Sequence, residues 1–518
     1  MTTTATYVMG IDSSTTATKA IVWDTEGHAV AEGRAEMPVA RPGRGLYEQR
    51  PEDWWSACCR AARAAVADLD PRAVVALAVA NQRETVAVLD GRMRPLRPAM
   101  LWCDERGRVQ VDRVAADLGG QRVHDATGKP VELCPALYRI LWLRDEERAT
   151  FDRAAHFVDV QGYLNWRLSG ELVTSWASAD PFGLLDMRRF AWHTALMDHL
   201  DLSPATFAPV VAPGTPVGTL TSEAAAACGL SAGTIVVAGA GDGQAAGLGA
   251  RALAPGRAYC NLGTAVVAGV QTRRYQVDPA FRTLTAAVPG AYVCEALLRT
   301  GTSLISWFVE HFGPEGAREA GASAEERLER LATTVPPGAE GLVLLPHWNA
   351  AGTPHWDGLA RGAVVGWTHA HGKAHFYRAV LEGLTMELRL SLDGIAGVTA
   401  EPIDRLVVTG GGARSPLWRR IVADVTGRTV IRVASAELTS LGAGMLAATG
   451  AHIFADVPAA AEAMSRDRED IHPIPAHRDL YDALFTGVYR PLYGALRDIM
   501  HTISIREIER ERSTPGDR

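Results

Sequence analysis

The chain has 518 residues, of which 47% are apolar and 21% charged. One hydrophobic core rarely serves so long a chain, so we expect two large domains in an ordinary globular protein. The net charge is −7 and the basic residues are scattered. This disfavours a nucleic-acid partner, because phosphate binding needs a concentrated basic face.

The first predicted elements form a hairpin around a run of hydroxyl-bearing residues, GIDSSTTATKAIVWDTEG (10–27). A strand ends at Ile11, a polar turn follows Asp12, and a second strand runs over residues 20–23. A turn of this kind is by itself more typical of plain β-structure than of a ligand site. Its functional interpretation is a phosphate cradle, in which N–H and hydroxyl groups donate to phosphate and the carboxylate holds Mg²⁺ through water.

Helical and strand-like segments then alternate along the chain. Residues 51–70 have a helical composition, with Pro51 in a first-turn position. Residues 73–80 form an apolar run typical of a strand that is buried on both faces. This alternation predicts an α/β architecture.

The next segments bear on the membrane and on the cell compartment. The uncharged stretch 224–241 is broken by glycines and predicts a helix end followed by a buried strand, not a membrane span. The N-terminus MTTTATYVMG has no basic or long apolar segment, so we expect no signal peptide. The seven cysteines include no C-x-x-C pair, which is typical of reduced thiols. We therefore expect a cytoplasmic protein without a membrane partner.

The second half repeats the pattern of the first. TIVVAGAGDGQ (234–244) predicts a strand that ends in glycines and Asp242. YCNLGTAVVAGV (259–270) predicts a strand, a tight turn at Gly263 and Thr264, and a second strand, like the opening hairpin. This similarity predicts two structurally related halves that meet near residues 250–256.

A glycine-rich turn follows in RLVVTGGGARSPLWRRIVADVTGR (405–428). A strand leads into Gly410–Gly412, and Ser415 with Pro416 predicts the start of a helix that ends at Gly427. A glycine turn before a helix N-terminus suits a nucleotide, although a plain structural turn fits equally well. The chain has no G-x-x-x-x-G-K-[ST] and no G-x-G-x-x-G, so a phosphate site must come from such turns.

Taken in order, these motifs resemble the FGGY family of carbohydrate kinases from residue 7 to about residue 450. The opening hairpin resembles the first phosphate motif of the family, residues 261–270 the second, and residues 409–427 the adenosine motif. Further similar stretches are YEQRPEDWW (47–55), GAGDGQAAGLGA (239–250) and GAVVGWTHAHGKAHFYRAVLEGL (362–384). In the last stretch Phe376, Val380, Leu384 and Leu388 indicate by themselves only a core-facing helix.

The resemblance implies an α/β fold of two actin-like (ribonuclease H-like) ATPase domains flanking a central cleft. We expect an N-terminal domain over residues 1–252, a C-terminal domain over 253–505, and a charged, frayed tail over 506–518. The implied partners are ATP, Mg²⁺ and a small sugar or polyol, and a homodimer stays open.

The resemblance also implies the site residues. Asp242 matches the general base, which accepts the hydroxyl proton during phosphoryl transfer, and Asp12 matches a metal-associated aspartate, so Asp12 and Asp242 are the expected metal residues. The positions that match ATP contacts are Thr15, Thr16, Lys19, Gly263, Thr264, Gly411, Gly412 and Ala413. Ser14 stands where the family usually has Gly, so its side chain must hydrogen-bond locally or tolerate the turn.

Residues 81–104 give the substrate side. NQRETVAVLDG (81–91) resembles glycerol kinases, in which the Arg and Glu that match Arg83 and Glu84 bind polyol hydroxyls. Trp102 and Asp104 lie where the family has a Trp wall and an acid. A solvated charge pair and a core Trp are equally consistent with the spacing alone.

The chain departs from glycerol kinases at two positions. Cys134 stands at a Tyr position and Gly243 at a Gln position, which predicts a wider pocket. LPHWNAAGTPHWDG (345–358) resembles xylulokinases, but the Met-His pair of that group is replaced by Arg83 and Glu84. We expect phosphorylation of a pentulose such as xylulose, with a glycerol or tetritol kinase as the alternative. An ATP-binding sensor without catalysis, or an Hsp70-like or actin-like ATPase, is the alternative of another class.

Overall fold

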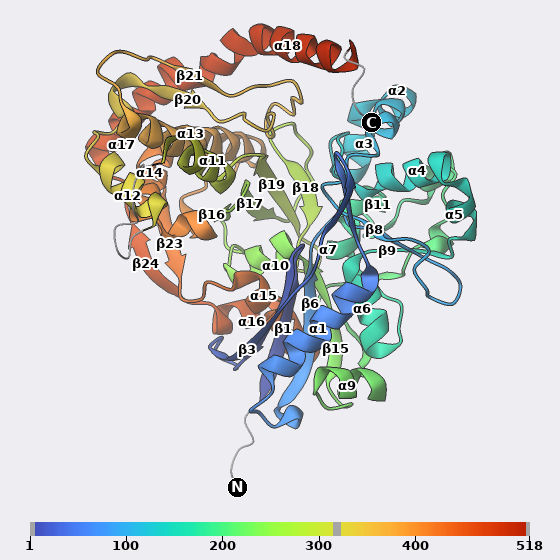
Figure 1. The fold of residues 1–518 in the computed structure, drawn as a ribbon. Coiled ribbons are helices and arrows are strands. Elements are labelled where there is room, and N and C mark those ends of the chain that lie inside the picture. The colour runs from blue at the N-terminus through green and yellow to red at the C-terminus, as the bar shows by residue number, and fades with distance from the viewer. Residues whose placement is uncertain (1–5, 314–322, 514–518) are drawn as a thin grey trace.

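Two β-sheets, one from each half of the chain, organise residues 6–313 and 323–513, which the computed structural model describes (Figure 1). In the described residues the first sheet has six strands in the order β14-β15-β6-β1-β2-β3. Their bounds are β1 Tyr7–Ser13, β2 Ala17–Trp23, β3 Ala29–Glu36, β6 Val74–Asn81, β14 Pro216–Thr219 and β15 Ile235–Gly241. β1 is antiparallel to β2 and parallel to β6, and β6 is parallel to β15.

The second sheet repeats this arrangement, which confirms the predicted relation between the halves. In the described residues its order is β18-β19-β17-β16-β22-β23-β24. Its strands are β16 Arg257–Leu262, β17 Val266–Thr272, β18 Arg282–Thr285, β19 Tyr292–Leu298, β22 Arg405–Thr409, β23 Thr429–Val433 and β24 Asp467–Ile471. β16 is antiparallel to β17 and parallel to β22, and β22 is parallel to β23. The fold is therefore a duplicated α/β unit.

Two helices that are rich in small residues lie between the sheets, α10 (Asp242–Gly249) and α15 (Leu438–Gly450) (Figure 1). A Cβ at Gly442 would lie 2.0 Å from the carbonyl oxygen of Ala245, so the two helices can touch only without a side chain there. The Ser440 hydroxyl of α15 donates to the carbonyl of Gly10 in β1 at 2.9 Å. α15 thus packs on the first sheet although it belongs to the second half of the sequence.

The predicted helix boundaries agree with the structure. α1 (Pro51–Ala65) begins at Pro51, and α14 (Pro416–Thr426) is capped by Ser415, whose hydroxyl accepts from the backbone N–H of Trp418 at 2.9 Å. α14 ends at Gly427, whose φ of 66° is left-handed. In α13 (Lys373–Thr399) a stripe of apolar side chains is buried, comprising Val380, Leu384 and Leu388.

The expectation of a frayed tail from residue 506 is wrong as far as Ser513. α18 (Arg490–Ser513) continues as a helix to that residue. Its Ser504 accepts a hydrogen bond from Arg361 at 2.8 Å and donates one to the carbonyl of Leu359 at 2.8 Å, which holds this end of the chain on the second half. Residues 514–518 of that tail, and residues 1–5 of the segment expected to lack a signal peptide, lie outside the described residues.

Helices α2 (Arg108–Leu118), α3 (Gly120–Thr127), α4 (Ala136–Glu146) and α5 (Arg148–Arg153) form an outer layer on the first half, on the right in Figure 1. Over the part of the chain that the structure describes, no helix combines the length and the apolar character that crossing a membrane requires.

Candidate active site

The carboxyl ends of the parallel strands β1, β6 and β15 lie at the same edge of the first sheet. Asp12 lies near the end of β1, Arg83 and Glu84 follow β6, and Asp242 follows β15. Ligands of open α/β sheets bind at such an edge. The sheet order therefore brings together residues that are separated by up to 230 positions in the sequence, counted from Asp12 to Asp242.

Asp242 is the first residue of α10, and its carboxylate is held through one oxygen. Arg83 Nε lies 3.0 Å from Asp242 Oδ1, and the backbone N–H of Gly243 donates to the same oxygen at 2.7 Å. The side chain of Asp242 is 40% exposed, which leaves it accessible to a substrate. Since both contacts use Oδ1, the other oxygen remains available to accept a proton.

Behind Asp242, a buried network of charges links the two sheets. Glu295, in the middle of β19, lies 3.1 Å from Arg83 Nη1 and 2.7 Å from Arg282 Nη2. Arg282 in turn lies 3.0 Å from Glu84 Oε1. Tyr259 completes the network by donating to Glu295 Oε2 at 2.7 Å. Arg83 and Glu84 of the first half are therefore held by residues of the second half.

Sequence reasoning missed Glu295, Arg282 and Tyr259. A signal for Glu295 exists, because it is the only charged residue in the apolar strand YVCEALL (292–298). Burial by itself would raise the pKa of Glu295, but the guanidiniums of Arg83 and Arg282 outweigh this effect and lower the pKa to about 2. Glu295 is thus a permanently charged anchor for both arginines.

Glu84 has an unusual backbone conformation for a residue with a side chain. Its φ is 58°, in the left-handed region. Its carbonyl accepts from Arg139 Nη2 at 2.6 Å, and its carboxylate pairs with Arg282. Burial raises the pKa of Glu84 despite these partners. Strain of this kind gathers at functional sites, where the surroundings over-determine the conformation.

The environment of the Asp12 carboxylate suits the binding of a cation. Its Oδ1 is buried and has no hydrogen-bond partner among the described residues. Burial, followed by the nearby charges of Asp242 and Glu437, raises the pKa of Asp12 to about 7, and Lys19 lowers it only in part. Carboxylate oxygens of this kind fit Mg²⁺, which binds proteins through one or two carboxylates and keeps several waters.

The structure pairs Lys19 with a carboxylate that the sequence did not single out. Lys19 Nζ lies 2.7 Å from Glu437 Oε1. Glu437 immediately precedes α15, much as Asp242 begins α10 in the first half. This ion pair therefore ties the opening hairpin to the second half.

The turn of the opening hairpin tolerates Ser14 through local hydrogen bonds. The amide and the hydroxyl of Ser14 both donate to the carbonyl of Ala17, at 3.0 and 2.8 Å. Thr15 follows, and its hydroxyl accepts from Trp102 Nε1 at 3.1 Å. Thr16 is exposed. The turn is thus braced from within and by Trp102.

Trp102 and Asp104 have different environments. Trp102 is 44% exposed beside the hairpin turn, as a wall of a binding site would be. Asp104 is fully buried. Arg106 donates to both of its carboxylate oxygens, from Nε to Oδ1 at 2.6 Å and from Nη2 to Oδ2 at 2.7 Å. The backbone N–H of Tyr47 donates to Asp104 as well, at 2.7 Å. The structure therefore commits the Asp104 carboxylate to protein contacts.

The matching edge of the second sheet carries the other predicted turns. The carbonyl of Gly263 accepts from Thr302 at 2.7 Å, that of Thr264 accepts from the Ser303 hydroxyl at 2.9 Å, and the Thr264 side chain is exposed. Residues Gly410, Gly411 and Ala413 line a pocket of about 340 Å³ together with Arg414, Arg432, Arg468 and Glu437. This volume lies in the range of small-molecule sites.

The buried network also occupies the space beside Gly243. Gly243 was expected to widen the substrate site, but a Cβ there would lie 3.1 Å from both Arg83 Cζ and Glu295 Oε2. The buried network already fills this space. Cys134 is the second departure. Its backbone carbonyl and that of Glu84 both accept from Arg139 Nη2, at 2.7 and 2.6 Å, so the two residues lie close together.

Comparison with known proteins agrees with this architecture. Residues 7–249 match the N-terminal domain, and residues 258–451 the C-terminal domain, of the FGGY family of carbohydrate kinases. Xylulose kinase of Bacillus subtilis is 28% identical over 95% of this chain and 98% of its own length. Glycerol kinase of Aromatoleum aromaticum is 31% identical over 87% and 91%. The crystal structure of xylulose kinase from Rhodospirillum rubrum has a TM-score of 0.88 at 28% identity, over 96% and 100% of the two chains.

Proposed function

Because the chain belongs to the FGGY family of carbohydrate kinases, we propose that it transfers the γ-phosphate of ATP to a primary hydroxyl of a pentulose such as xylulose. Asp242 carries this proposal, since it is a partly exposed carboxylate at a helix start with one oxygen fixed by Arg83. We further propose that residues 1–252 and 253–505 form the two domains.

In the proposed reaction, Asp242 accepts the proton of the substrate hydroxyl while that oxygen attacks the γ-phosphorus. Arg83 and the Gly243 amide keep the Asp242 carboxylate oriented, which lowers the entropy cost of reaching a reactive geometry. Trp102 supplies an aromatic wall, and the Glu84 carboxylate, whose Oε1 pairs with Arg282, supplies an acceptor for further hydroxyls.

Asp12, with Asp242, would hold Mg²⁺, which neutralises phosphate charge when bound. The turns at Thr15–Thr16 and Gly263–Thr264 offer hydroxyl and amide donors for the phosphates. Gly411 and Ala413, which line the pocket, would contact the nucleoside, while Gly412 is buried against Trp418 and would support this turn from behind. Lys19 could reach phosphate only by sharing or leaving Glu437. Closure of the two halves would exclude water and limit wasteful ATP hydrolysis.

The preference for a pentulose rests on two observations. Cys134, whose carbonyl shares the donor Arg139 Nη2 with that of Glu84, is smaller than the Tyr of glycerol kinases. A xylulose kinase is similar over nearly the whole chain. Arg83 and Glu84 favour the second candidate, a glycerol or tetritol kinase, because this pair follows the glycerol-kinase pattern.

A panel of acceptors tests the proposal. Release of ADP from Mg-ATP is measured with xylulose, ribulose, glycerol and erythritol, each over a range of concentrations. We expect the highest kcat/KM with a pentulose. A higher kcat/KM for glycerol or erythritol would select the second candidate, and nucleotide binding without any sugar-stimulated release would indicate a sensor.

A further inference from the structure

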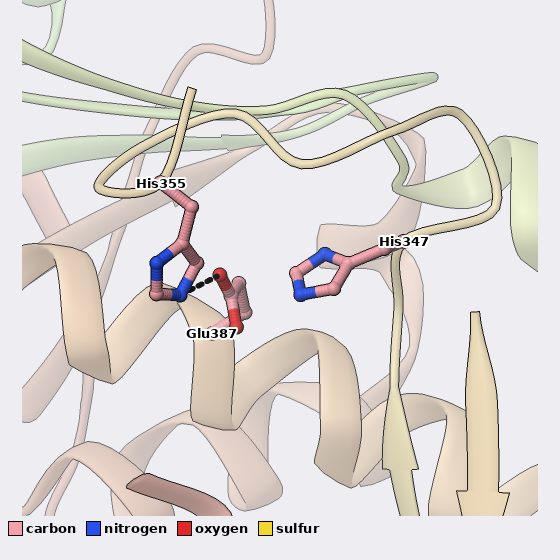
Figure 2. Close-up of side chains that lie close together, drawn as sticks. All are labelled: His347, His355 and Glu387. Atoms are coloured by element: carbon pink, nitrogen blue, oxygen red, sulfur yellow. Dashed lines mark ion pairs between the residues drawn. The ribbon is translucent and has the colours of Figure 1, made fainter. Parts of the chain in front are cut away.

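A second constellation of potential ligand atoms lies in the C-terminal half. His347, His355 and Glu387 point toward one another in Figure 2. Their ligand atoms all lie within 4.8 Å of one another, and His355 Nε2 lies 4.0 Å from Glu387 Oε1. Nothing in the proposed phosphoryl transfer uses these three residues.

The three side chains converge from separate segments. His347 follows β20 (Val343–Leu345), and His355 lies further along the same loop, before β21 (Ala363–Val365). Glu387 lies in the middle of the long helix α13. An ion bound among them would therefore fasten the loop to the helix, and closing a loop in this way favours the folded state.

Three buried polar atoms at this place lack hydrogen-bond partners. They are His347 Nε2, His355 Nε2 and Glu387 Oε1, and none has a partner within the described ranges. His347 is 3% exposed and Glu387 2%. Buried polar groups without partners are rare and costly, and they point to a missing water or ion.

From this geometry we infer that His347, His355 and Glu387 form a binding site for one divalent transition-metal ion of the Zn²⁺ class. Two imidazoles and a carboxylate are a common zinc ligand set, and imidazole favours such ions over Mg²⁺. Ligands at about 2.0–2.1 Å from a tetrahedral ion stand about 3.3 Å apart, so binding needs side-chain movements of about 1 Å or less.

The surroundings suit metal binding. Tyr489 donates to the second oxygen of Glu387 at 2.6 Å and so orients the carboxylate. His355 stacks on Tyr493 at 3.7 Å between ring centres, and its side chain is 20% exposed, which offers an entry path.

The loop that carries both histidines also touches the strand of Glu295. The amide of Thr353 donates to the carbonyl of Leu297, and the amide of Leu297 donates to the Thr353 hydroxyl, both at 3.0 Å. Leu297 lies in β19, two residues after Glu295. A metal ion here would brace that strand and act on stability, outside the reaction itself.

The test measures metal binding to the purified full-length protein. The chain is stripped with a chelator and titrated with Zn²⁺, and Co²⁺ serves as a probe through its visible absorption. We expect one tightly bound ion per chain, the spectrum of four-coordinate Co²⁺, and a higher unfolding temperature with Zn²⁺. Failure of the wild-type protein to bind either ion would overturn the inference.

Variants locate the ion. Glu387→Gln and His355→Gln keep side-chain size and should each weaken Zn²⁺ binding by more than about 100-fold, and Tyr489→Phe by roughly 10–100-fold. If Glu387→Gln fails to fold, His355→Gln carries the test, since its side chain is the most exposed of the three.

His369→Gln is the matched control, because His369 is exposed in a segment that also holds His371 and His375. We expect its affinity for Zn²⁺ to equal that of the wild type. Loss of binding in His369→Gln, with binding retained in His355→Gln and Glu387→Gln, would assign the ion to surface histidines and refute the site.

Discussion

Arg83 Nε lies 3.0 Å from Asp242 Oδ1, and this contact joins the two residues that carry the proposed chemistry. The guanidinium of Arg83 also lies 3.1 Å from Glu295, which belongs to the other half of the chain. The orientation of the proposed base therefore depends on a carboxylate of the opposite sheet.

Glu295→Gln should destabilise the protein and disturb Asp242. The substitution leaves the buried guanidiniums of Arg83 and Arg282 without their shared counter-charge, which we expect to cost about 3–5 kcal/mol of unfolding free energy. Urea unfolding measures this loss of stability. A lower kcat with the preferred sugar would show that Asp242 is no longer held in its reactive orientation. The control is Glu462→Gln, since Glu462 pairs with Arg251 on the surface and is 77% exposed. Equal stability losses in the two variants would contradict this role of Glu295.

Asp12→Asn should change how stability depends on pH in the absence of metal. The pKa of Asp12 is raised from 3.8 to about 7 in the folded state. Between these values the folded chain holds a proton that the unfolded chain has lost, so stability falls as the pH rises and levels off above about 7. The variant lacks this contribution. Its unfolding temperature should decline less than that of the wild type from about pH 5 to about pH 8.

Added Mg²⁺ provides the second half of this experiment. A bound cation compensates the Asp12 charge, so Mg-ADP should stabilise the wild-type protein more at the high end of that pH range than at the low end. Asp12→Asn should lose this gain. Identical pH profiles of the two proteins, with and without Mg-ADP, would refute a metal-associated role for Asp12.

Cys134→Tyr should shift the preference from pentuloses toward glycerol. A tyrosine side chain would take up space near Glu84, and such a change in a pocket typically alters relative kcat/KM by roughly 10–200-fold. The ratio of kcat/KM for xylulose to that for glycerol should therefore fall by at least about tenfold. Cys134→Ser keeps the size of the side chain and should leave the ratio near the wild-type value. An unchanged ratio in Cys134→Tyr would place the selectivity elsewhere.

The sequence predicted the parts of the molecule that are local. Apolar runs in the sequence predicted the strands β1, β6 and β15. Because the carboxyl ends of parallel strands lie at one edge of a sheet, Asp12, Arg83 and Asp242 lie close together there. Ser415 and Gly427 bounded α14 through capping, which depends on neighbouring residues alone.

The parts that depend on distant pairing were not predictable in the same way. Nothing around Lys19 indicates its ion pair with Glu437, which is 418 positions later in the sequence, and nothing around Gly243 shows that Arg83 and Glu295 fill its space. The helix at the end of the chain was missed for the same reason, since Arg361 contacts Ser504 only in the folded molecule.

The most direct test of the central claim is the rate of sugar phosphorylation by Asp242→Asn. Asparagine keeps the size of the side chain and an oxygen for the Gly243 amide, but it cannot accept the proton. We predict that kcat falls by about 10²–10⁴-fold, while ADP still binds with near wild-type affinity. Turnover at the wild-type rate in a correctly folded Asp242→Asn protein would contradict the account.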